Sequence, residues 1–134
     1  MISRAAMKKL AITTVLLVPS CSPSSSKTDV AGTYAAYFKG DVAVLVLNAD
    51  HTCRQTITGK DGKVINNMAS WNTVVMGPDE VVIEFSKFHI IPSYSREKAD
   101  EINWSTSVER TLLGALQFCF DSDSGYCYVR QSRP

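Results

Sequence analysis

From Ala31 onward, apolar and polar residues follow one another in short segments with the alternation that is typical of β-strands. β-Branched and aromatic residues dominate these segments, Gly, Asn and Asp interrupt them, and no long apolar stripe has helical spacing. We therefore predict an all-β domain. Its strands are expected near residues 33–38, 42–47, 52–58, 64–66, 70–75, 81–85, 104–109, 116–120 and 126–130.

Short polar connections predict how these strands pair. Residues 48–51 and 59–62 each join two predicted strands, and residues 77–80 follow the strand that contains Trp71. Connections of this length force antiparallel pairing, because a parallel crossover needs a dozen or more residues. The sequence therefore predicts an antiparallel meander.

The strands differ in how their apolar residues alternate. Residues 42–47 are apolar on both faces, which predicts a central strand covered on two sides, whereas residues 70–75 and 81–85 alternate as half-buried strands do. A meander that closes into a barrel accommodates both kinds and removes exposed edges. Residues 95–101 interrupt the pattern, and we expect a short helix or a polar loop there.

The order of these features resembles small lipocalin-like barrels found in uncharacterised bacterial lipoproteins. In that family a strand with alternate leucines meets an Asp-Gly-Thr turn, and the next strands bring a Gly-x-Trp motif and an apolar run. Here His51 replaces the turn glycine and Ala69 stands where the glycine precedes tryptophan. The resemblance implies a lipocalin-like barrel. The matching positions are residues 45–52, Gly59, Trp71 and residues 81–85.

Residues 1–20 have the layout of a secretory signal peptide. Arg4, Lys8 and Lys9 form a positive start, and the apolar run 10–18 follows them. This run is shorter than the roughly 20 residues that cross a bilayer as a helix. We therefore predict a leader that is removed from the mature protein.

Residues 17–21 resemble the lipobox of bacterial lipoproteins, in which apolar residues and a small residue precede an acylated cysteine, although Pro19 departs from that pattern. The resemblance implies that Cys21 is lipidated and becomes the mature N-terminus. An ordinary secreted protein with an unmodified cysteine is the alternative. Residues 21–30 contain few apolar side chains and are predicted to form a flexible tether, with a single β-barrel domain over residues 31–134. Several acyl chains would hold such a protein durably on a membrane.

The net charge argues against one class of partner. Removal of Arg4, Lys8 and Lys9 from the 14 basic residues leaves 11, against 13 acidic residues, so the mature chain carries a net charge of −2. Nucleic-acid binding requires a concentrated basic face that displaces counterions from phosphates. We therefore expect no nucleic-acid partner.

Patterns for catalysis and metal binding are weak. His51 lies in a predicted turn, His89 lies among apolar neighbours, and no serine occupies a Gly-x-Ser-x-Gly elbow. His51 and Cys53 supply only two of the four ligands that a structural zinc site needs. The acidic segment 121–125 is interpreted as a hairpin turn and not as a calcium loop. We predict no catalytic residue, no metal site and no cofactor.

Aromatic residues admit two interpretations, because they either fill the barrel or line an apolar pocket at its mouth. The leading hypothesis is a non-catalytic binding module of the bacterial cell envelope, held to a membrane by its lipid, that captures a protein partner as an inhibitor or immunity protein would. The alternatives are a lipocalin-type carrier of a hydrophobic small molecule and a hydrolase of envelope polymers. The weak candidates for ligand-binding residues are Tyr34, Trp71, Phe85 and Trp104.

The cysteines predict a disulfide. If Cys21 carries lipid, three cysteines remain in a compartment where thiols oxidise. Cys119 and Cys127 face each other if the last hairpin is centred on Asp123, at a spacing that a cross-strand disulfide requires. We predict a Cys119–Cys127 bond and a free, mostly buried Cys53. The alternative is a bond from Cys53 to either of the other two.

Overall fold

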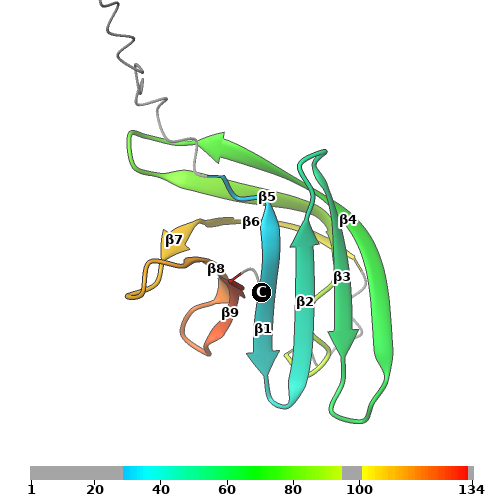
Figure 1. The fold of residues 1–134 in the computed structure, drawn as a ribbon. Coiled ribbons are helices and arrows are strands. Elements are labelled where there is room, and N and C mark those ends of the chain that lie inside the picture. Colours follow the sequence, from blue (N-terminus) through cyan, green and yellow to red (C-terminus); the bar gives the residue numbers. More distant parts are fainter. Residues whose placement is uncertain (1–28, 95–100, 133–134) are drawn as a thin grey trace, which may run out of the picture.

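A computed structural model describes residues 29–94 and 101–132 of the chain. The predicted signal peptide, Cys21, most of the tether and nearly all of the interrupting segment 95–101 lie outside the described residues. Within the described residues every strand pairing is antiparallel. The strands, shown in Figure 1, are β1 (Gly32–Phe38), β2 (Asp41–Leu47), β3 (Thr52–Thr58), β4 (Val64–Val75), β5 (Val81–Phe88), β6 (Ile102–Ser107), β7 (Glu109–Arg110), β8 (Leu116–Asp121) and β9 (Tyr126–Arg130).

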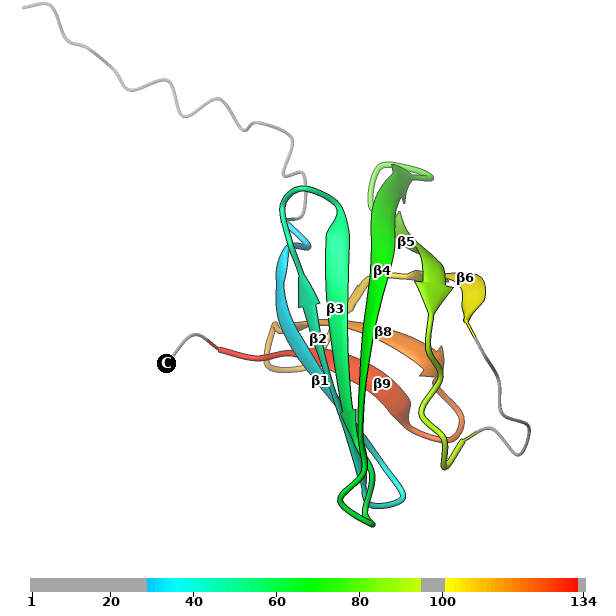
Figure 2. The ribbon, with the colours of Figure 1, turned by 90° about the vertical axis from the view of Figure 1, so that its right-hand side faces the viewer.

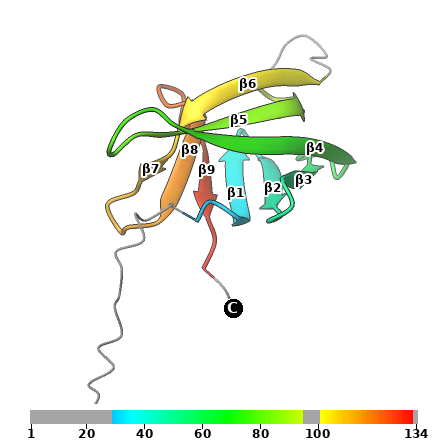
Figure 3. The ribbon, with the colours of Figure 1, turned by 90° about the horizontal axis from the view of Figure 1, so that it is seen from above.

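The sheet closes on itself through one bent strand. In the hydrogen-bonded order β6-β5-β4-β3-β2-β1-β9-β8-β7, the two ends β6 and β7 are separated in sequence by Val108 alone. Val108 donates its N–H to Val81 O at 2.8 Å, and Thr106 Oγ1 donates to Cys119 O at 3.0 Å. Figure 3 shows β4, β5 and β6 crossing over β1, β9 and β8. The predicted all-β meander that closes into a lipocalin-like barrel is confirmed as a nearly closed barrel.

The barrel has two ends because successive strands alternate in direction. The described chain begins at the end where β1 starts, and this N-terminal end also holds the β2–β3, β4–β5 and β7–β8 connections. The far end holds the β1–β2, β3–β4, β5–β6 and β8–β9 connections (Figure 2).

Aromatic side chains dominate the interior. The rings of Tyr34 and Phe118 lie 4.8 Å apart, and Phe118 in turn contacts Phe85 and Tyr128 at 5.5 and 5.6 Å between ring centroids. Burying one such side chain stabilises a fold by about 1.5–3 kcal/mol. Packed rings therefore form a large part of the core, beside aliphatic side chains. Its buried aromatic members are Tyr34, Phe38, Trp71, Phe85, Phe88, Phe118, Tyr126 and Tyr128.

The plug segment, residues 89–94, crosses the far end of the barrel. β5 leaves β4 after a left-handed residue, Lys87, with φ 59°. The side chain of Gln55 then binds the His89 backbone as a neighbouring strand would: its Nε2 donates to His89 O at 2.9 Å, and its Oε1 accepts from His89 N at 2.8 Å. Ile91 is fully buried and donates its N–H to the Tyr126 hydroxyl at 3.2 Å. The plug segment thus belongs to the core.

Asp41 ties the plug segment to two other parts of the far end. Its carboxylate accepts hydrogen bonds from Lys60 N and Ser93 N, each at 3.0 Å. Burial alone would raise the pKa of Asp41, but the hydrogen bonds from Ser93 and Lys60 outweigh burial and hold its pKa below the ordinary value. The folded state therefore favours the ionised form of Asp41.

Two sequence-based predictions about strands are wrong. The expected break between residues 66 and 70 does not exist, because Asn67 pairs with Gln55 and donates its Nδ2 to Gln55 Oε1 at 2.9 Å, so the pairing overrides the low strand propensity of asparagine. The strand expected over residues 104–109 is divided at Val108, where the chain bends to change partners.

The prediction that β2 is covered on two sides is also wrong. Its inward residues Ala43 and Leu45 are buried, but the outward Val44 is 36% exposed. A barrel has one interior, and no described element packs over the outer face of β2.

The predicted Cys119–Cys127 disulfide is confirmed. The two residues are direct partners in the β8–β9 pairing, and a disulfide joins them. Cys53 is a free and fully buried thiol, as predicted. The alternative prediction, a disulfide from Cys53 to Cys119 or Cys127, is therefore wrong. Burial raises the pKa of the Cys53 thiol to about 12, so this thiol stays protonated and unreactive in the folded protein.

Candidate functional site

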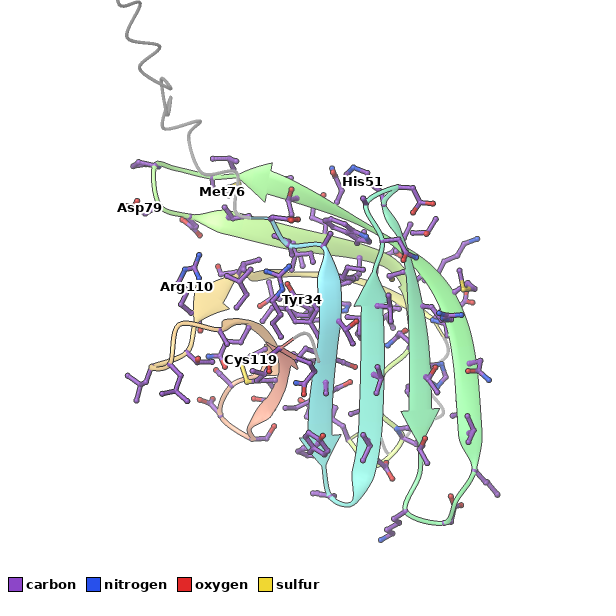
Figure 4. All side chains as sticks on the ribbon, in the orientation of Figure 1. Tyr34, His51, Met76, Asp79, Arg110 and Cys119 are labelled. Carbon is purple, nitrogen blue, oxygen red and sulfur yellow. A yellow bond between two sulfur atoms is a disulfide. The ribbon has the colours of Figure 1, made fainter. Side chains whose placement is uncertain are left out.

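Tyr34 and Trp71, two of the weak ligand-binding candidates, lie buried in the core with their polar atoms already bonded. The Tyr34 hydroxyl donates to Val30 O at 2.7 Å, and burial raises the pKa of Tyr34 to about 12. The indole Nε1 of Trp71 lies within hydrogen-bond distance of Asn48 O and Thr52 O, at 3.0 and 3.1 Å. Figure 4 shows Tyr34 on β1, inside the barrel. Both side chains hold the barrel to its own loops.

Phe85 and Trp104, the other two candidates, stack on each other with ring centroids 5.3 Å apart and planes 18° apart. Phe118 contacts both Phe85 and Tyr34, so the structure brings three of the four candidates into one cluster. Trp104 is half-buried, and its Nε1 is buried without a hydrogen-bond partner among the described residues. These rings pack against one another inside the barrel.

His51 takes part in the structure of the β2–β3 turn. Its ring stacks on Trp71 at 5.0 Å between centroids, and its Nδ1 lies 3.1 Å from Trp71 O. The neighbouring Asp50 accepts hydrogen bonds from Thr52 N and Oγ1 at 3.0 and 2.6 Å, and these bonds lower the pKa of Asp50. Across residues 29–94 and 101–132, no three His, Cys, Asp or Glu side chains gather as metal ligands would.

His89 lines an open pocket of about 440 Å³ at the place where β5 leaves β4. Sequence reasoning missed this pocket, because its walls come from β4, from His89 and from Glu101, which are far apart in the sequence. The described lining residues include no Ser, Cys or Thr that could serve as a nucleophile of the triad kind. The described lining consists of Ile65, Asn66, Asn67, His89 and Glu101.

The outer face of β1–β4 carries an apolar surface. Tyr37 is 68% exposed and Met68 is 59% exposed, and both lie on strands whose outward positions are in register. Arg54 is the one charged residue among the outward side chains of these four strands. We call this surface the outer-face patch. It comprises Tyr37, Val42, Val44, Val46, Val64 and Met68.

The register explains how the outer-face patch forms. Tyr37 pairs with Val42, Val42 with Thr58, and Thr58 with Val64, so one row of outward side chains crosses all four strands. Strand residues alternate between faces, so every second residue must point outward. Threonine is also enriched in strands and is more polar than valine, so strand formation alone does not require valines at these exposed positions. The valines at alternate positions of β2 were the feature of the sequence that could have predicted the outer-face patch.

The β4–β5 and β7–β8 connections at the N-terminal end each expose apolar side chains, Met76 on the first and Leu112 and Leu113 on the second. Figure 4 shows Met76 and Asp79 on the first connection and Arg110 close to the second. Residues 29–94 and 101–132 include no helix with the length and apolar character needed to cross a bilayer. Comparisons with family models, with curated proteins and with solved structures find no match to this chain.

Proposed function

We propose that this protein is a non-catalytic binding module of the bacterial cell envelope, anchored to a membrane through a lipidated Cys21, which captures a protein partner. The outer-face patch is the observation that carries this proposal. Its six residues lie on β1, β2 and β4, the outward positions of β1–β4 include a single charged residue, and no described element covers it. The outward residues of β3, which lie between β2 and β4, are Thr52, Arg54, Thr56 and Thr58. Apolar surface of this kind is typical of binding sites for other proteins.

The composition of the patch favours a protein over a small molecule. Tyr and Met are enriched in the cores of protein interfaces, and charged residues are depleted there. A large exposed aromatic such as Tyr37 is the kind of side chain that supplies most of the binding energy in an interface. A broad sheet face also offers no concave site that would enclose a small molecule.

The interior and the histidines weigh against the two alternatives. A carrier would need room where Tyr34, Phe85 and Phe118 pack together. A hydrolase would need a histidine beside a nucleophile, whereas the His51 ring stacks on Trp71. Binding on the outside of the barrel conflicts with neither observation.

Two features support the envelope location. Disulfides such as Cys119–Cys127 persist in oxidising compartments and are rare in the cytosol. The lipobox-like segment that ends at Cys21 provides the means of attachment. A Cys21→Ser variant is expected to leave the membrane fraction, and retention of that variant on the membrane would contradict the anchor.

Site-specific photo-cross-linking in the producing cells tests the binding site. A photoactivatable amino acid at position 44 is expected to cross-link to one discrete envelope protein. The matched control places the same amino acid at position 84, because Glu84 is an exposed outward residue of the neighbouring strand β5. Equal cross-linking from both positions, or no protein product from position 44, would overturn capture on the outer-face patch.

A further inference from the structure

Leu112 and Leu113 are the most exposed apolar side chains of the described residues, at 107% and 97% of full exposure. They lie at the tip of the β7–β8 hairpin and touch none of the core. Two adjacent leucines in water forgo the stabilisation that burial would give them. Such exposure indicates that these leucines contact another molecule.

The backbone of this turn holds the leucines outward. Thr111 N donates to Ala115 O at 2.8 Å, Gly114 N donates to Thr111 O at 2.9 Å, and Ala115 N donates to Thr111 Oγ1 at 3.1 Å. Gly114 has φ +83°, a left-handed conformation that favours glycine and completes the turn. Arg110 Nη1 donates to Gly114 O at 2.9 Å. The leucines therefore occupy the two central positions of a well-bonded turn, where polar residues are usual.

The leucine turn, residues 111–115, lies at the N-terminal end of the barrel. At the same end, Val75 at the end of β4 and Met76 in the β4–β5 connection are 69% and 63% exposed. Figures 1 and 3 both show these two connections projecting to the same side of the barrel. Arg130 fixes the start of the described chain at this end, because its Nη1 donates to Asp29 O at 3.0 Å.

The turns at the far end are more polar. The β1–β2 turn carries Lys39 and Gly40, and the β3–β4 turn carries Lys60, Asp61 and Lys63. Among the described turns, the large exposed apolar side chains Met76, Leu112 and Leu113 lie at the N-terminal end, together with the acidic Asp79 and Glu80. Tyr37 and Val64 are exposed apolar residues of strands at the far end. Apolar side chains that project from a protein surface can be buried in the interfacial region of a bilayer.

We propose that the leucine turn inserts into the surface of the bilayer to which Cys21 anchors the chain, so that the N-terminal end of the barrel faces the lipid. This inference rests on the anchor of the proposed function. The seven residues between Cys21 and Asp29 reach at most roughly 30 Å when extended, which keeps this end near the bilayer. Asp79 and Glu80 on the β4–β5 connection oppose attraction to anionic lipid, so the contact is hydrophobic and does not require anionic headgroups.

Tryptophan quenching in phosphatidylcholine vesicles tests the contact. Full-length protein is purified from membranes, reconstituted, and compared as Leu112→Trp and Lys63→Trp variants with and without brominated acyl chains. Lys63 is the matched control, because its side chain is 86% exposed in the β3–β4 turn at the far end and lies outside the outer-face patch. The indole introduced at position 112 is expected to shift its emission to the blue and to be quenched by the brominated lipid. The indole at position 63 is expected to do neither, and Trp71 and Trp104 give the same background in both variants.

Mass spectrometry of the N-terminal peptide in the same preparation separates the two proposals. An acylated chain whose indole at position 112 is not quenched overturns the leucine contact and leaves the anchor standing. A chain without acyl groups overturns the anchor, and an unquenched indole in that chain overturns the leucine contact as well. A blue shift that brominated lipid does not quench, together with cross-linked dimers, would assign the leucines to a second copy of the chain and overturn the lipid contact.

Discussion

The two faces of strand β2 are both apolar, but one is buried in the core and the other faces outward. Ala43, Leu45 and Leu47 point inward and are buried in the aromatic core, whereas Val42, Val44 and Val46 point outward into the outer-face patch. Apolar residues on the inner face are explained by folding, because the barrel cannot form without them. Apolar residues on the outer face need another explanation, and the proposed partner provides it. An inward substitution should therefore cost stability, and an outward one should cost binding.

The largest loss of stability is expected from Phe118→Ala. Phe118 contacts Tyr34, Phe85 and Tyr128 and is fully buried, so its truncation should lower the free energy of unfolding by about 3–5 kcal/mol. Chemical denaturation measures this value. A loss below about 1 kcal/mol would mean that the interior is loosely filled, which would favour the carrier hypothesis.

The next largest effect is expected from Gln55→Leu, which should lower the free energy of unfolding by about 2–4 kcal/mol. This substitution leaves the N–H and C=O of His89 without their hydrogen-bond partner at the far end of the barrel. Denaturation of this variant should be compared with Thr56→Val, since Thr56 is the adjacent, outward residue of β3. Similar stabilities of the two variants would argue against the plug segment as part of the core.

Replacement of Cys119 and Cys127 together by alanine should cost about 2–3 kcal/mol on the chain-entropy view of a bond that closes a loop with a sequence separation of 8. Peptide mapping without reductant should show the Cys119–Cys127 link in the wild type. A linked peptide that contains Cys53 would contradict both the pairing and the hairpin register.

Acid should remove a further contribution of about 1–2 kcal/mol that depends on Asp41. Because the folded-state pKa of Asp41 is lowered, its stabilising effect is complete above the unfolded value near 3.9 and disappears as the pH falls through the folded value. Unfolding midpoints of the wild type and of Asp41→Asn should therefore differ at pH 6 and converge toward pH 2. A difference that stays constant over this range would contradict the assignment to the ionised carboxylate.

The smallest effect on stability is expected from Val44→Lys, at within about 0.5 kcal/mol of the wild type. The same substitution places a charge in the middle of the outer-face patch and should abolish the protein cross-link from a photoactivatable residue at position 37. A variant that unfolds readily would instead show that the outer face supports the fold.

Local features of the sequence predicted much of the fold. The β3 and β9 segments follow from alternation and turn residues, and the Cys119–Cys127 pair follows from the symmetry of one short hairpin. These features depend on residues that are near one another in the chain. The alternating pattern thus specifies strands and the hairpin register.

Features built from distant residues escaped sequence reasoning. The hydrogen bonds between Gln55 and His89 join positions 34 residues apart, and the bend at Val108 depends on pairing with two different strands. The outer-face patch was also missed, because apolar residues on both faces of β2 indicated two covered sides. Alternation assigns side chains to faces, but it does not say which face meets the core and which meets solvent.

A captured partner would cover the outer-face patch in the envelope and leave it free in the isolated protein. Thiol labelling of Val44→Cys by a membrane-impermeant reagent distinguishes these two states, with Glu84→Cys as the control and with Cys53 silent because it is buried and protonated. We expect rapid labelling at position 44 in the purified protein and slow labelling in intact envelopes, while position 84 reacts at the same rate in both. Equal rates at position 44 in the purified protein and in the envelope would rule out a partner on this face.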